Sequence, residues 1–150
     1  MSPETAAEIG RIGAVSAMAL AAVGSGLGAY YGGAGAAGAW KKMTSQGKPA
    51  SFTLITFVGA PLSQTIYGMI LMITMVGKAD AGYDPWALLG VGIVAGLGMG
   101  VSAYGQGKVG AYCADALAET GQGFSNYLAV IGIVETVAIF VLVFSLLALG

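Results

Sequence analysis

AVIGIVETVAIFVLV, residues 129–143, is apolar throughout apart from Glu135 and Thr136. No lysine, arginine or histidine lies within this run to neutralise the carboxylate. A charged side chain at the centre of a membrane helix costs about 2.5–3.5 kcal/mol on insertion scales, so the default interpretation of such a residue is functional. The run therefore predicts a membrane-spanning helix with a functional glutamate near its middle. The alternative is a protonated glutamate that only packs and hydrogen-bonds.

Composition indicates that the whole chain belongs in a membrane. Of its 150 residues, 57% are hydrophobic and 9% are charged, whereas soluble domains carry about 25% charged residues. The net charge of −1 and the lack of a basic run give no reason to expect nucleic acid as a partner. Cys113 is the single cysteine, so an intrachain disulfide is impossible.

Clusters of charge divide the chain into four apolar segments. The segments cover about residues 12–40, 51–76, 86–112 and 127–149. Each meets the length of about 20 residues that a bilayer-spanning helix needs. The predicted fold class is an all-α membrane protein with four transmembrane helices. The leading MSPETAAEIGR has no basic n-region and contains two glutamates, so we expect no signal peptide.

The connections between the segments predict an orientation. KKMTSQGKPAS, residues 41–51, carries three lysines, and the positive-inside rule assigns such a connection to the cytoplasm. Four spans then place the third connection, ADALAETGQGFSN, on the same side. Both termini and the middle connection, GKADAGYDP, are expected outside. We therefore expect a multi-pass protein of the cell membrane, the plasma membrane of a prokaryote.

The chain also looks like a duplicated hairpin. GLGAYYGGAGA in the first segment is similar to GVSAYGQGKVGAY in the third, with Ala29 and Tyr30 aligned to Ala103 and Tyr104. The repeat length is about 74 residues. We predict two hairpins, residues 1–76 and 77–150, that form one compact membrane unit.

Glycine is concentrated in the first and third segments. Small residues let helix backbones approach closely in lipid. We therefore expect these two helices to form a tightly packed inner layer and the bulkier second and fourth helices to face lipid, as a ring of hairpins requires. GSGLGA, residues 24–29, and GMGVSA, residues 98–103, fit a dinucleotide-binding pattern, but they lie inside helical segments instead of a strand–turn–helix unit. We interpret them as packing residues.

The second segment contains the polar stretch APLSQTIYG, residues 60–68. Pro61 has no N–H and interrupts the helical hydrogen-bond ladder, so nearby carbonyls, including that of Ala60, are expected to be available to other partners. Ser63 and Gln64 share the helix face of Ala60, and Tyr67 lies one turn further along it. A Ser63 hydroxyl that bonds only its own backbone is the alternative.

Gln106, between two glycines of the third segment, and Glu135 complete this polar set. The set offers hard oxygen donors with a single negative charge, which suits a monovalent cation better than Ca²⁺. A proton site would need only the carboxylate and one partner, so the set favours Na⁺ or Li⁺, with H⁺ as the alternative. We expect Tyr67 to donate a hydrogen bond to Glu135. Thr65 and Thr136 are less favoured substitutes, and Gln106 could instead join two helices.

Three motifs on these helices resemble a known family. They are PLSQTIYG, residues 61–68, GQGKVGA, residues 105–111, and IVETVAIF, residues 133–140. Together they are similar to the proteolipid subunit of the V-type ATPase rotor ring, also called subunit K or c, and to its bacterial sodium-translocating branch. The resemblance covers nearly the whole chain. The family has threonine where Ser63 stands and leucine where Ala60 stands, and neither change removes a donor. Leu62 stands near the place of the glutamate's counterpart, which implies one site per chain.

The resemblance implies a non-catalytic subunit of a homo-oligomeric rotor ring that carries Na⁺ across the membrane as ATP is hydrolysed elsewhere in the complex. Glu135 would carry the ion and Tyr67 would lock it by a hydrogen bond. The implied Na⁺ ligands are Glu135, Gln106, Gln64, Ser63 and the main-chain carbonyl of Ala60. The implied partners are membrane lipid, central-stalk subunits and a stator subunit with an essential arginine. The alternatives are a proton-translocating ring, a stand-alone structural or channel proteolipid, and a small transporter acting alone.

Overall fold

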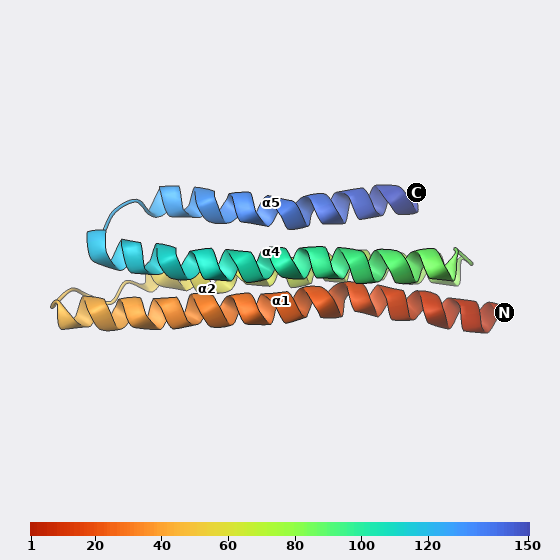
Figure 1. The fold of residues 1–150 in the computed structure, drawn as a ribbon, viewed down its shortest axis with the longest axis horizontal. Coiled ribbons are helices and arrows are strands. Elements are labelled where there is room, and N and C mark those ends of the chain that lie inside the picture. Colours follow the sequence, from red (N-terminus) through yellow and green to blue (C-terminus); the bar gives the residue numbers. More distant parts are fainter.

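The computed structural model describes residues 1–150 as a bundle of long helices (Figure 1). Four helical stretches are long and apolar enough to cross a membrane, and the second of them, Phe52–Asp80, is composite. The elements are α1 (Pro3–Ser45), η1 (Phe52–Leu54), α2 (Ile55–Gly59), η2 (Ala60–Leu62), α3 (Ser63–Asp80), α4 (Pro85–Thr120) and α5 (Phe124–Leu149), with η1 and η2 as 3-10 turns. No strand is present. The predicted fold class, an all-α membrane protein, is confirmed.

The helices are longer than the apolar segments that predicted them. α1 begins at Pro3, where the Ser2 side chain accepts a hydrogen bond from the Thr5 N–H, well before the expected start near residue 12. α4 continues to Thr120 and ends at Gly121, which has a φ of 67°. The third connection is therefore much shorter than the predicted ADALAETGQGFSN. The apolar run marks the part of a helix that lies in the bilayer, whereas capping groups determine the residues at which the helix begins and ends.

α1 and α4 run side by side in the same direction (Figure 1). Their backbones touch through glycines: a Cβ on Gly24 would lie 2.0 Å from the carbonyl oxygen of Gly100, and a Cβ on Gly107 would lie 2.0 Å from that of Gly28. Only glycine permits this approach. The expected tight packing of the first and third helices is present. The division into two hairpins stays a prediction.

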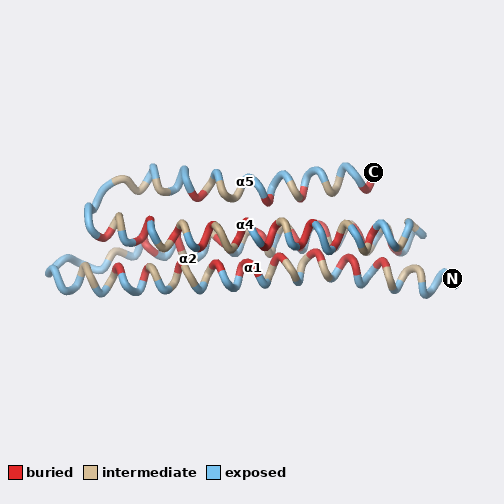
Figure 2. Tube along the Cα trace, in the orientation of Figure 1, coloured by how far each residue is buried: buried red, intermediate tan, exposed pale blue.

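α3 packs against both α1 and α4, whereas α5 packs mainly against α4. α5 is the least covered helix: 17% of its most apolar window is buried, against 39% in α1 and 44% in α4 (Figure 2). An open apolar groove of about 760 Å³, lined by Val94, Phe140 and Phe144 among others, separates α4 from the second half of α5. α5 is thus exposed on much of its surface and depends on α4 for its position.

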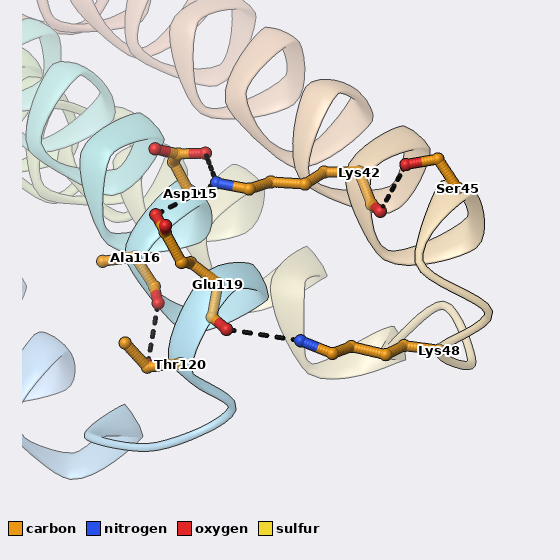
Figure 3. A network of polar contacts seen from close by, with 7 residues as sticks. All are labelled: Lys42, Ser45, Lys48, Asp115, Ala116, Glu119 and Thr120. Atoms are coloured by element: carbon orange, nitrogen blue, oxygen red, sulfur yellow. Dashed lines mark hydrogen bonds and ion pairs between the residues drawn. The ribbon is translucent and has the colours of Figure 1, made fainter.

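The connections that follow α1 and α4 lie at one end of the molecule, and both termini lie at the other (Figure 1). Two ion pairs join the end of α1 to α4, and a hydrogen bond joins the connection after α1 to α4 (Figure 3). Lys42 Nζ lies 3.3 Å from Asp115 Oδ1 and 3.0 Å from Glu119 Oε2, and Lys48 Nζ donates to the Glu119 carbonyl at 3.3 Å. These contacts fix α1 and α4 to each other beyond the glycine contacts, at the end where α4 leads into α5.

Candidate functional site

Glu135 lies near the middle of α5 and is half-buried. Each of its carboxylate oxygens accepts one hydrogen bond from a different element. Tyr67 Oη of α3 donates to Oε1 at 2.7 Å, and Gln106 Nε2 of α4 donates to Oε2 at 3.3 Å. The structure therefore places Glu135 with both of the residues that sequence analysis assigned to it from the neighbouring helices.

Gln106 connects the carboxylate to the rest of the polar set. Its side chain is fully buried. Besides Glu135, its Nε2 donates to the Ile131 carbonyl of α5 at 3.2 Å, while its Oε1 accepts from Gln64 Nε2 at 3.0 Å. Gln64, also fully buried, reaches across from the first turn of α3. The two amides thus lie in direct contact between three helices.

Pro61 shapes the other end of the set. The chain tightens into the 3-10 turn η2 at this residue, because proline offers no N–H for a regular helical bond. The Ser63 N–H bonds the Ala60 carbonyl across this turn. Ser63 Oγ donates to the same carbonyl at 3.0 Å and also lies 3.2 Å from Gln64 Oε1. The Ala60 carbonyl faces the polar set but is already an acceptor, so it is less free than sequence analysis expected.

Ser102 also joins the set, and sequence analysis missed it. Its Oγ donates to the Val134 carbonyl of α5 at 2.8 Å and lies 3.5 Å from Gln64 Nε2. Its position four residues before Gln106 gives both the same helix face, which is the signal that could have found it. Ser102 and Gln106 together hold the first half of α5 against α4.

The less favoured threonines stand apart from this network. Thr136 is exposed and its Oγ1 donates to the Ile133 carbonyl of its own helix at 2.7 Å. Thr65 makes no side-chain hydrogen bond. The G-x-G-x-x-A sequences lie in the interiors of α1 and α4, where Gly24 and Gly100 form the interhelical contact, as interpreted from the sequence.

The polar set is rich in oxygen donors. Within one hydrogen-bonded network lie a carboxylate, two amide carbonyls, a serine hydroxyl and a main-chain carbonyl, and hard cations prefer oxygen donors of these kinds. The set carries one formal negative charge, from Glu135, which a monovalent cation would balance. The phenol of Tyr67 occupies one oxygen of this carboxylate as a donor, so it acts on the carboxylate and not on a cation.

Comparisons with known proteins show what the chain is similar to. A family model described as the ATP synthase C-subunit matches residues 89–148, which include Gln106 and Glu135. The A-type ATP synthase subunit K of Methanocaldococcus jannaschii is 35% identical over 142 residues, or 94% of this chain. The chain spans 61% of that relative's length. Together the two matches support the identification of this chain as a rotor proteolipid of the V/A type, as its motifs predicted.

Proposed function

We propose that this chain is the ion-carrying subunit of the membrane rotor ring of a V-type ATPase, with Na⁺ as its cargo and Glu135 as the carboxylate that holds it. The match to the ATP synthase C-subunit family implies that copies of the chain assemble into a ring. The M. jannaschii relative is described as a subunit of an ATP synthase. The chain itself is non-catalytic, and nucleotide chemistry belongs to other subunits.

One observation carries the sodium proposal. A continuous path of hydrogen bonds runs from the Ala60 carbonyl through Ser63, Gln64 and Gln106 to Glu135. A proton carrier would need a carboxylate and one hydrogen-bond partner, which Tyr67 supplies alone. Both amides are fully buried, and burial of a polar group in a membrane costs free energy unless its polar atoms have partners. Their carbonyl oxygens, with those of Glu135, Ser63 and Ala60, are the Na⁺ ligands that we propose.

The cargo would cross the membrane by neutralisation and release. Na⁺ bound at Glu135 cancels the carboxylate charge, so that the loaded site can pass lipid as the ring turns. Tyr67 would hold the carboxylate in place while it is loaded. Release requires a competing positive charge, and a stator subunit with an essential arginine would supply it. Central-stalk subunits would transmit rotation driven by ATP hydrolysis. The ring would lie in the cell membrane with the connections that follow α1 and α4 in the cytoplasm.

The test is protection of Glu135 from a carbodiimide. This reagent modifies a protonated carboxyl group, so a bound Na⁺ should exclude it. We expect millimolar Na⁺, but not K⁺ at the same concentration, to slow the labelling of the purified ring at constant pH. Glu135→Gln serves as the control, because it removes the labelled group while it keeps the side-chain size.

The outcomes separate the alternatives. Labelling that depends on pH but not on Na⁺ would overturn the sodium proposal and favour a proton-translocating ring. A Glu135→Gln chain that fails to assemble would indicate a structural glutamate. Copurification with an ATPase head and stalk would exclude a stand-alone proteolipid or transporter.

A further inference from the structure

Ser25, in the middle of α1, is an unpaired polar group inside the bundle. The residue is 1% exposed, and its Oγ is the one buried side-chain oxygen or nitrogen without a hydrogen-bond partner. A serine within a helix ordinarily bonds a carbonyl of its own preceding turn. Ser16 of the same helix does so, with Oγ 2.8 Å from the Ile12 carbonyl. An unpaired buried hydroxyl destabilises a folded protein, so a second state in which the Ser25 hydroxyl has a partner would be favoured.

The register of α1 against α3 identifies its neighbour. A Cβ on Gly32 of α1 would lie 2.4 Å from the Phe57 carbonyl oxygen of α2, and Gly28 packs against Pro61, so α1 and the composite second helix run antiparallel. Ser25 is seven residues before Gly32, and Gln64 is seven residues after Phe57. The contact between Gly28 and Pro61 leads to the same pairing, because each is three residues away from its member of the pair. The register therefore puts Ser25 of α1 at the same level as Gln64 of α3.

Cation binding would change what the Gln64 side chain needs. In the structure its Nε2 donates to Gln106 Oε1 at 3.0 Å. If both amide oxygens turn to a cation, this hydrogen bond is lost, and the Gln64 NH₂ group points away from the ion with two hydrogens to satisfy. Ser102 Oγ, at 3.5 Å, can accept one of them because its own hydrogen is donated to the Val134 carbonyl. One hydrogen of Gln64 still lacks an acceptor.

We propose that Ser25 supplies this acceptor and is a positioning residue for Na⁺. Its hydroxyl oxygen receives the second Gln64 hydrogen when the Gln64 carbonyl oxygen faces the ion. Ser25 does not touch the cargo: it stabilises the amide orientation that coordinates the cargo. This inference rests on the proposed sodium site, and it adds a residue from α1, the one transmembrane helix that contributes no ligand to that site.

The experiment compares Na⁺ protection of Glu135 in three versions of the purified ring. Ser25→Ala removes the acceptor, and Ser16→Ala is the matched control on the same helix, because the Ser16 hydroxyl is bonded to its own backbone. We expect Ser25→Ala to raise the Na⁺ concentration for half-maximal protection about tenfold, the size of effect for a buried donor left unpaired. Ser16→Ala should leave it unchanged. Carbodiimide labelling without Na⁺ should proceed equally in all three rings, a readout that damage to packing would alter.

Ser25→Cys gives a second measurement if the alanine ring assembles poorly. It preserves the volume of the side chain, and sulfur is a weak acceptor, so its Na⁺ response should shift in the same direction. Na⁺ protection that is strong and equal in the native and Ser25→Ala rings would overturn the role of Ser25 and leave the sodium site standing. Absence of Na⁺ protection in the native ring would overturn both. Altered labelling without Na⁺, or failure of both variants to assemble, would assign Ser25 a packing role and also overturn the inference.

Discussion

At the scale of single residues, Glu135 is held by donors from two helices that are distant in sequence. Tyr67 and Gln106 each occupy one oxygen of the carboxylate. A hydrogen bond to an ionised acceptor is stronger than one between neutral groups, so the shorter contact, at 2.7 Å from Tyr67 Oη to Glu135 Oε1, is the more important restraint. The carboxylate is thereby kept toward the amides and away from the lipid-facing side of α5.

Tyr67→Phe should weaken the retention of Na⁺. The substitution keeps the ring and removes the single hydrogen bond to Glu135 Oε1. A hydrogen bond to a charged group contributes about 1.5–3 kcal/mol, so the Na⁺ concentration for half-maximal protection from carbodiimide should rise at least tenfold. Tyr30→Phe, at an exposed tyrosine of α1 without a side-chain hydrogen bond, is the matched control. Equal protection of both variants would show that the phenol does not restrain the carboxylate.

The residues that sequence analysis identified are those whose chemistry is costly in lipid. Glu135, Gln64 and Gln106 stand out because a carboxylate or an amide in an apolar run needs a reason. Ser102 and Ser25 do not stand out, since small hydroxyl residues are common in membrane helices and usually bond their own backbone. Their roles depend on the register between helices, which no local pattern encodes.

At the scale of helices, the contact between α1 and α4 sets the position of the polar set. Gly28 and Gly107 meet backbone to backbone, and Gly107 is the immediate neighbour of Gln106. Close contact of this kind replaces the hydrophobic driving force that helices lack in lipid. The depth of Gln106 in the bundle therefore depends on a contact that no side chain larger than hydrogen can make.

Gly107→Ala should separate the two helices. The added Cβ would lie 2.0 Å from the Gly28 carbonyl oxygen, so the backbone must move. Overpacking of this kind costs about 1–3 kcal/mol, which thermal unfolding of the ring in detergent should show as a lower melting temperature. Gly90→Ala in the same helix is the control, because its Cβ would meet nothing within 4 Å. That change should be neutral or stabilising by up to about 1 kcal/mol, since alanine favours helix. Equal melting temperatures for both variants would contradict the glycine contact.

The helices themselves were predictable, but their ends and internal break were only partly so. Four apolar runs of sufficient length gave the number of spans. Pro61 predicted the interruption of the second helix. The 3-10 geometry, which keeps the Ala60 carbonyl bonded to Ser63, could be seen only in the structure. α1 and α4 continue past their apolar runs because residues such as Ala and Glu favour helix outside the bilayer as well as within it.

At the scale of the whole molecule, the two ends differ in their basic side chains. The end with the connections that follow α1 and α4 carries Lys41, Lys42 and Lys48. At the end with the termini, Arg11 pairs with Asp80 at 2.7 Å and Lys78 donates to the Gly150 carbonyl. The positive-inside rule counts basic residues near the membrane and gives little weight to acidic ones. It therefore favours the connection end as the cytoplasmic one.

Single cysteines can test this orientation in vesicles of known sidedness. Gln46→Cys lies in the connection after α1, Gln122→Cys in the connection after α4, and Ala81→Cys in the turn between α3 and α4. All three positions are exposed. A membrane-impermeant maleimide should label the first two from the cytoplasmic face and the third from the opposite face. The native chain is the control, because its one cysteine, Cys113, is buried and should not react. Labelling of Ala81→Cys from the cytoplasm would reverse the predicted orientation.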